Sequence, residues 1–184
     1  MNMTVRTIKT DAQTYSPAQK EQAQKCNVPI YLYPGAYAQR HGEIEEYRAS
    51  RQANIACRDA IDAAIREHFR DNVLSKKAVQ SVIGQYGFDR TMYVLAVTVL
   101  DKDGDGRISQ SNRNWAKMQP IFADPDDRGN ERNRAFVVRA HPGLTDLFLR
   151  EVRHEKAASL EKKMPQMKKQ KRSCRVSDRR WKPG

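Results

Sequence analysis

The stretch "FDRTMYVLAVTVL", residues 88–100, decides the fold class of this chain. Its β-branched residues favour a strand. Its apolar residues also recur at the spacing of a buried helix, and these are Met92, Tyr93, Leu95, Ala96, Val99 and Leu100. No other segment of the sequence offers a strand to pair with it. We therefore interpret this stretch as a helix and expect an all-α fold.

Helix start and stop signals divide the sequence before this stretch. Pro34 can open a short helix and Gly42 can close it. Residues 43–69 contain neither Pro nor Gly, which permits one long helix. Ser75 is a suitable N-cap for a further helix that ends at Gly87.

The sequence after residue 100 predicts shorter helical segments. Ser111 is the expected N-cap of a short helix that Pro120 stops. Residues 130–163 have the pattern of two helices that are broken before Pro142.

A chain of 184 residues is long enough for one domain with a substantial core. We expect a single compact helical domain over residues 27–161, with one long central helix. Residues 1–26 are polar and rich in Gln, and we expect them to be poorly ordered.

The net charge of +12 is concentrated at the C-terminus. Residues 162–184 contain ten Lys or Arg and one acid, so they carry +9 of it. Their low apolar content predicts a disordered basic tail. This tail is either a solvated end or an arm that binds the phosphates of DNA, with an aromatic residue to stack on a base. The residues of such an arm would be Lys168, Lys169, Lys171, Arg172, Arg175, Arg179, Arg180 and Trp181.

The sequence also predicts the compartment. No apolar run approaches the roughly 20 residues that span a bilayer, and the N-terminus lacks the apolar segment of a signal peptide. The three cysteines are widely spaced and form no C-x-x-C pair. We expect a cytoplasmic protein with reduced thiols and no membrane partner.

Residues 101–112, "DKDGDGRISQSN", match the first positions of an EF-hand calcium loop. Position twelve of that loop is normally a glutamate that binds the ion with both oxygens, and here it is Asn112. The chain also has no second loop of this kind. We therefore favour a pair of Asp-Gly turns that joins two helices, and we expect no metal or other cofactor. If the loop did bind calcium, Asp101, Asp103 and Asp105 would be its weak candidate ligands.

Two polar clusters are candidates for binding a partner. One lies on the long helix, where Arg51, Asn54 and Arg58 share a face and Arg48 flanks them. Such a face is either solvated or a binding surface for carboxylate or phosphate. The second cluster contains Arg107, Asn112, Arg113 and Lys117, around a Trp115 that we expect in the core. The sequence has no catalytic motif that we can identify, so we expect no enzyme.

Three blocks of this sequence resemble a known domain family. They are "YAQRHGEIEEYRASRQANIACRDAIDAAI", "YGFDRTMYVLAVTVLDKDGDGRISQSNRNWA" and "RNRAFVVRAHPGLTDLFLREVR", and together they cover about residues 31–156. The family has no known biochemistry and is carried by conjugative elements and phages of gut Firmicutes. Its pattern resembles Asp105-Gly106-Arg107, Ser109, Ser111-Asn112 and Trp115-Ala116, without Asp101 and Asp103.

The chain is also similar in length and context to anti-CRISPR proteins that inhibit type II CRISPR effector nucleases. That resemblance implies a non-enzymatic inhibitor whose partner is the effector nuclease with its guide RNA, inside a bacterial host cell. The basic charge disfavours mimicry of DNA, which requires acidic residues. A DNA-binding accessory protein of a mobile element is the alternative, and an EF-hand-like calcium-binding module is the second alternative.

Overall fold

The computed structural model describes residues 28–122 and 136–177, with side chains up to Met164 in the last helix. The described part of the chain is predominantly α-helical, as the sequence predicts. The prediction for residues 1–26 lies outside the described residues. The elements are α2 (Gly35–His41), α3 (Ile44–His68), β1 (Phe69–Arg70), β2 (Val73–Leu74), α4 (Lys76–Asp101), α5 (Gln110–Lys117) and α6 (Pro142–Ser177).

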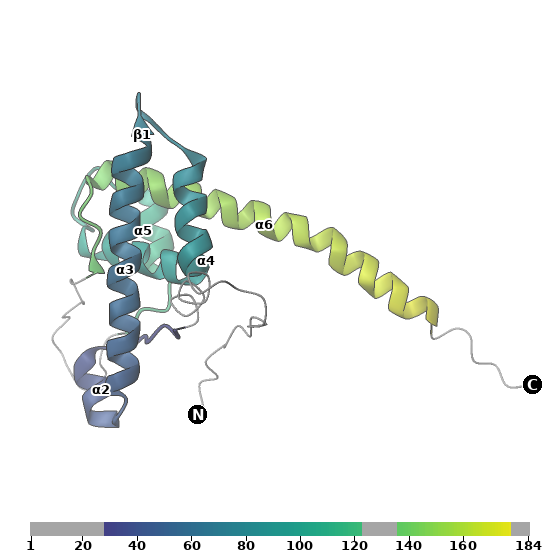
Figure 1. The fold of residues 1–184 in the computed structure, drawn as a ribbon, viewed down its shortest axis with the longest axis horizontal. Helices are drawn as coiled ribbons and strands as arrows, with labels where there is room; N and C mark the ends of the chain where they lie inside the picture. Colours follow the sequence, from purple (N-terminus) through teal and green to yellow (C-terminus); the bar gives the residue numbers. More distant parts are fainter. Residues whose placement is uncertain (1–27, 123–135, 178–184) are drawn as a thin grey trace, which may run out of the picture.

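Helix α4 is the centre of the fold, and residues 88–100 form its second part (Figure 1). Helices α3, α5 and α6 all pack against α4. Nearly every residue from Arg90 to Val99 is therefore buried, which explains why this stretch is apolar all round. Gly87 has φ 75° and ψ 163°, so it separates two helical segments within α4. The predicted helix and the predicted break at Gly87 are both confirmed.

Helix α3 lies along α4 and supplies much of the core. It starts just after Gly42, whose φ of 72° is the left-handed conformation that closes α2. Cys57 and Ile61 of α3 are completely buried against α4. Ser75 caps α4, since its side chain accepts a hydrogen bond from the backbone N–H of Lys77 at 3.3 Å. These helix boundaries agree with the sequence signals.

A short β-hairpin, which the sequence pattern does not indicate, connects α3 to α4. Phe69 pairs with Leu74 across the two antiparallel strands. The two turn residues, Asp71 and Asn72, have φ values of 51° and 61°, as a two-residue hairpin turn with matching twist requires. Figure 1 shows the hairpin at the tip of the molecule, where Val73 is exposed.

Residues 137–141 are not helical, which corrects the prediction of a helix directly before Pro142. Their backbone groups bond instead to side chains of α3 and α4. Asp62 accepts hydrogen bonds from the N–H groups of Arg139 and Ala140, and Thr98 Oγ1 accepts one from Val138 at 3.0 Å. These side chains satisfy polar backbone groups that a helix would otherwise pair internally.

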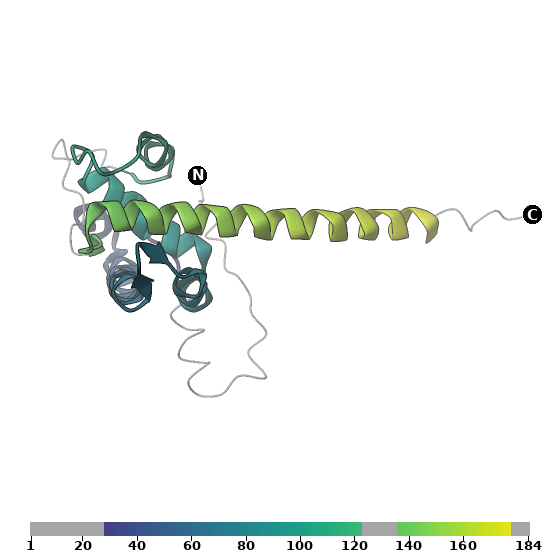
Figure 2. The same ribbon diagram turned by 90° about the horizontal axis from the view of Figure 1, so that it is seen from above.

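Helix α6 begins on the body and then projects away from it (Figures 1 and 2). Phe148, Leu149 and Val152 of its first half are completely buried. The helix continues to Ser177, whereas the sequence predicts a disordered tail over 162–184. Lys, Met, Gln and Arg favour helix, and a helix that is already nucleated by packing extends at little cost. Residues 178–184 lie outside the described part.

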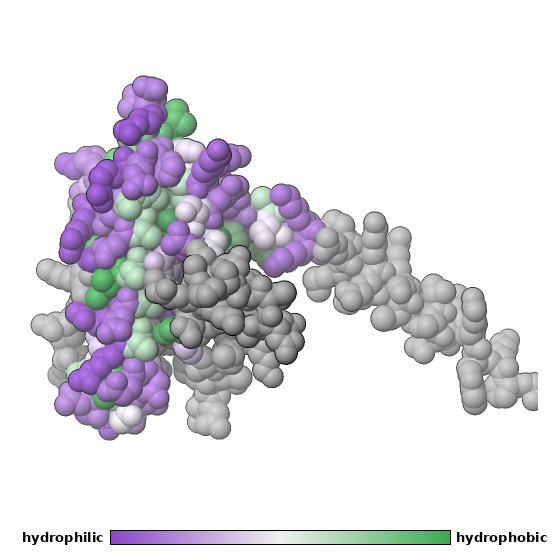
Figure 3. Space-filling model, in the orientation of Figure 1, coloured by the Kyte–Doolittle hydropathy of each residue, from purple (hydrophilic) through white to green (hydrophobic). Residues whose placement is uncertain are grey.

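The surface of the body is largely hydrophilic in the view of Figure 3, with a small apolar area on the hairpin. Among the described residues, no helix is both long and apolar enough to cross a membrane.

Candidate functional site

A buried polar junction joins the starts of α5 and α6. At its centre is Asp146, whose Oδ1 accepts three hydrogen bonds from the loop and helix opposite. These come from Ser109 N at 2.9 Å, Ser109 Oγ at 2.8 Å and Asn112 Nδ2 at 2.7 Å. Arg150 donates to the other carboxylate oxygen at 3.0 Å. One carboxylate therefore holds the N-terminus of α5 against α6.

The surroundings of Asp146 favour its ionised form. Burial by itself raises the pKa of this carboxyl group. The hydrogen bonds from Ser109, Asn112 and Arg150 outweigh burial, so the pKa of Asp146 lies below its usual value. The junction therefore contains a carboxylate that is already fully engaged by internal donors.

Arg153 extends the junction to the outer side of α5. Its Nη1 donates to Asn112 Oδ1 at 2.7 Å and to Ser111 Oγ at 3.3 Å. Its guanidinium group also lies 5.7 Å from the centre of the Trp115 ring, within range of a cation–π interaction. The side chain of Asn112 thus uses both its oxygen and its nitrogen within the fold.

The sequence pattern around residue 109 has a structural role in this junction. Ser109 is the N-cap of α5, because its side chain accepts from Asn112 N at 3.4 Å. This corrects the prediction that Ser111 caps this helix. Trp115 is buried, as expected. Asn112 is likewise buried, so it offers no surface to a partner.

In the loop that resembles an EF-hand, residues 101–112, polar side chains bond to groups within the fold or lie near cations. Asp105 Oδ1 accepts from Arg107 N at 2.9 Å, which is the Asx turn that the Asp-Gly interpretation predicts. Asp103 lies 3.6 Å from Lys117 Nζ. Within residues 28–122 and 136–177, no three His, Cys, Asp or Glu side chains are grouped so that they could hold a metal ion.

The cations of the second predicted cluster are divided between the fold and the surface. Arg113 donates through Nη2 to the backbone oxygen of Asp105, so it stabilises the loop. Lys117 and Arg107 are exposed. Arg107 lies beside His141 at the start of α6.

The polar stripe on α3 is not one continuous surface. Arg48 and Arg51 are exposed, but Asn54 and Arg58 are buried. The buried Arg90 of α4 donates a hydrogen bond to the side chain of Asn54. Arg90 also donates to the backbone oxygens of Ser50 in α3 and of Val28. Asn54 is therefore part of the α3–α4 contact, and Arg58 is buried as well.

The basic half of α6, defined as residues 162–177, contains seven basic residues and no acidic ones. Five of the predicted nucleic-acid-binding residues belong to this helical backbone: Lys168, Lys169, Lys171, Arg172 and Arg175. Their side chains lie outside the described part, as do Arg179, Arg180 and Trp181. The helix carries this charge away from the body (Figure 2).

Residues 30–157 match the model of a family described as protein of unknown function (DUF3849). The chain belongs to the DUF3849 family. The matched range agrees closely with the region over which the sequence resembles a family of unknown biochemistry. No curated protein and no solved structure matches the chain. The DUF3849 region covers the helical body and ends shortly before the basic half of α6 begins.

Three residues that organise this DUF3849 body were missed in the sequence: Asp146, Arg153 and Arg90. Asp146 and Arg90 are buried charges within otherwise apolar helix patterns, whereas Arg153 lies among other charged residues. Asp146 precedes the buried Phe148 and Leu149, and Arg90 precedes a nearly completely buried run. A charge on the buried face of a helix requires a partner, and that requirement is the signal that could have identified Asp146 and Arg90.

Proposed function

We propose that this DUF3849 protein acts by binding a nucleoprotein, and that its target is a type II CRISPR effector nuclease loaded with guide RNA. The observation that carries the proposal is α6, which projects from the body as a helix and places seven basic residues beyond it. The proposal assigns the protein a binding role without catalysis, in the manner of an anti-CRISPR inhibitor encoded by a mobile element.

The basic half of α6 is suited to a phosphate backbone. Its 16 residues extend over about 24 Å at about 1.5 Å per residue. Duplex DNA carries one negative charge per about 1.7 Å of its axis, so a helix of this length lies within reach of several phosphates. Contacts of this kind supply affinity without sequence specificity.

A guide-loaded nuclease presents both protein and nucleic acid, and this chain has two surfaces to match. The helical body offers folded protein surface, including the exposed Arg48 and Arg51 of α3. The basic half of α6 offers charge to the guide RNA or to DNA. Because the chain is basic, direct contact with nucleic acid is more favourable than imitation of it.

A DNA-binding accessory protein of a mobile element is the second candidate function. The same observation favours it, since a helical segment with seven cations and no acids is suited to bind DNA without any protein partner. The two candidates differ in whether the body contributes to binding.

The deciding experiment is a pull-down with the tagged full-length chain and three targets: guide-loaded nuclease, nuclease without guide, and naked duplex. A cleavage assay runs in parallel. Retention of the guide-loaded nuclease at a salt concentration that releases duplex, together with loss of cleavage, supports the inhibitor. Retention of duplex alone supports the accessory protein, and retention of none of the targets contradicts both.

A variant with Lys168, Lys169, Lys171 and Arg172 changed to Gln tests the basic half of α6. The matched control changes four exposed cations near the hairpin to Gln, namely Arg66, Arg70, Lys76 and Lys77. The proposal expects the first variant to lose much more affinity than the control, although both lose four charges. Equal losses would mean that net charge alone determines binding.

A further inference from the structure

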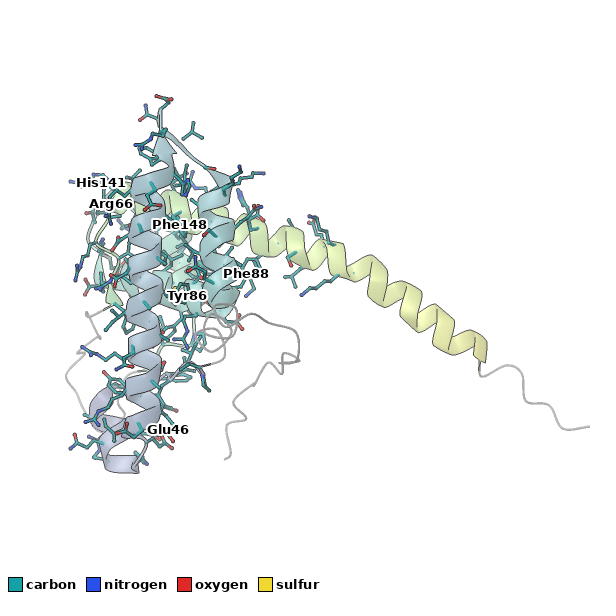
Figure 4. All side chains as sticks on the ribbon, in the orientation of Figure 1. Glu46, Arg66, Tyr86, Phe88, His141 and Phe148 are labelled. Carbon is teal, nitrogen blue, oxygen red and sulfur yellow. The ribbon has the colours of Figure 1, made fainter. Side chains whose placement is uncertain are left out.

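Arg107 and His141 meet on the surface of the body where α6 begins. Arg107 Nη1 lies 3.1 Å from His141 Nε2. Both residues are exposed, and 60% of the Arg107 side-chain surface is accessible. Figure 4 shows His141 at the edge of the body, at the end of α6 opposite to its projecting half.

The other nitrogen of His141 fixes which atom carries the ring proton. Gly143 N donates a hydrogen bond to His141 Nδ1 at 3.2 Å, so Nδ1 accepts and carries no proton. In a neutral imidazole the proton must then be on Nε2. His141 therefore acts as the N-cap of α6 through one nitrogen and presents an N–H group with the other.

This Nε2–H faces a group that can only donate. The guanidinium of arginine has five N–H donors and no acceptor. The 3.1 Å contact between Arg107 and His141 therefore places two donors side by side. A group with two or more acceptor oxygens would satisfy both of them together.

The neighbouring protein groups do not fill this role. Asp105 Oδ1 forms an ion pair with Arg107 through Nε at 3.8 Å and accepts the backbone N–H of Arg107, so it engages a different nitrogen from the Nη1 that faces His141. The amides of Leu144 and Thr145 bond to the backbone oxygen of His141, so they are engaged within the first turn of α6.

We propose that the Arg107–His141 pair is a binding site for a phosphate group. Phosphate has enough oxygens to accept from the planar arginine fork and from the imidazole N–H at once. The start of a 36-residue helix also favours a negative charge at this position. With 60% of its side-chain surface accessible, Arg107 can be reached by such an ion from solvent. The site is separate from the basic half of α6, so it extends the proposed function without depending on it.

The test is an NMR titration of the full-length chain with inorganic phosphate, observing the Arg107 Nε–H and the His141 ring. We expect saturable shifts of both groups. In Arg107→Ala the affinity for phosphate falls by at least about tenfold, because charge-assisted hydrogen bonds are lost. Absence of saturable shifts in the unaltered chain would overturn the site.

A second variant separates binding from folding. His141→Asn keeps an acceptor oxygen for Gly143 N and so preserves the N-cap, but it removes the Nε2–H donor. It should fold like the parent chain and lose phosphate affinity to a similar extent as Arg107→Ala. The matched control is Arg139→Ala, which removes an exposed cation two residues away and should bind phosphate like the parent. Equal weakening in the control would show a general charge effect and overturn the site.

The nitrogen shifts of the His141 ring give an independent readout before any ligand is added. The proposal requires the tautomer with the proton on Nε2. A proton on Nδ1 would let Arg107 donate to Nε2 directly, and this outcome would overturn the site.

A duplex oligonucleotide in place of inorganic phosphate identifies the source of the phosphate group. This arm uses the variant in which the four basic residues of α6 are changed to Gln, so that α6 contributes less to binding. Shifts of Arg107 and His141 with the duplex assign the site to nucleic acid, and shifts with inorganic phosphate alone assign it to a small phosphate compound. Each outcome supports the site. Failure of the proposed function would appear separately, as loss of nuclease binding in the pull-down.

Discussion

The two halves of α6 are one continuous helix with different sources of stability. The half on the body buries Phe148, Leu149 and Val152 completely. Beyond these residues, Leu160 and Met164 are 55% and 57% exposed, and the helix continues away from the body (Figure 1). The inner half is therefore stabilised by packing, and the outer half by local helix propensity. Changes in the inner half should affect folding, and changes in the outer half should affect binding.

The largest expected effect on folding is at Phe148. Phe148→Ala removes a completely buried ring, and we expect it to lower the free energy of unfolding by about 3–5 kcal/mol. The matched control is the exposed Leu160, which lies beyond the buried part of the helix, and Leu160→Ala should change the free energy of unfolding by less than about 0.5 kcal/mol. Urea denaturation measures both. Similar losses in the two variants would show that the helix is also packed at Leu160 in solution.

Asp146 tests the polar part of the inner half. Asp146→Asn removes the charge that Ser109, Asn112 and Arg150 engage, and we expect a loss of about 1.5–3 kcal/mol at neutral pH. The control Asp89→Asn, at a carboxylate that is 77% exposed, should cost less than about 1 kcal/mol.

The difference in stability between the parent chain and Asp146→Asn should depend on pH. Because the pKa of Asp146 is lowered in the folded state, its contribution to stability is fully present above the unfolded value of about 3.9. It is lost as the pH falls through the lower folded value. The stability difference between the parent and Asp146→Asn should therefore shrink on acidification below about pH 4. A difference that stays constant down to pH 2 would contradict this account.

Removal of the outer half should separate binding from folding. We expect a chain that ends at Glu161 to unfold within about 1 kcal/mol of the full chain, since it keeps every completely buried residue of α6. Its affinity for duplex DNA should fall steeply. The slope of log affinity against log salt should decrease in size by about 3 or more, because each lost phosphate contact removes about 0.9. Equal slopes for the two chains would exclude the basic half as a DNA-binding element.

The smallest expected effect concerns the loop before α5. We expect about 1 mM Ca²⁺ to raise the melting temperature by less than about 2 °C, because a weak site gives little stabilisation by mass action. The reason is that Asp105 and Asn112 are engaged within the fold. A larger rise that disappears in Asp101→Ala would identify a calcium site that the internal hydrogen bonds do not prevent.

Helix boundaries that depend on a few adjacent residues were predictable from the sequence. Gly42, Ser75 and Gly87 mark boundaries because their backbone conformation or side chain acts within one turn of helix. The end of α6 was not predictable in this way. Composition beyond residue 161 indicates disorder, but it contains no information about the packed helix from which that segment continues.

The polar contacts of the candidate site depend on residues far apart in the sequence. Asn112 and Asp146 are 34 positions apart, and Asn54 and Arg90 are 36 positions apart. Spacing within one helix showed that Asn54 and Arg58 share a face, but it could not show that Arg90 of α4 bonds to Asn54 or that Arg58 is buried. The same reasoning applies to the loop at residues 101–112, where the local motif matches a calcium loop and the distant Asp146 determines what Asn112 does.

Cys57 offers a way to observe the contact of α3 with α4 over time. Its thiol is completely buried and lies 4.0 Å from Thr91 Oγ1 of α4. A thiol reagent can react with Cys57 only while the two helices are transiently apart, so the labelling rate at this position measures how often the contact opens. In a chain with Cys26 and Cys174 changed to Ser, the one remaining thiol therefore reports how often the core opens.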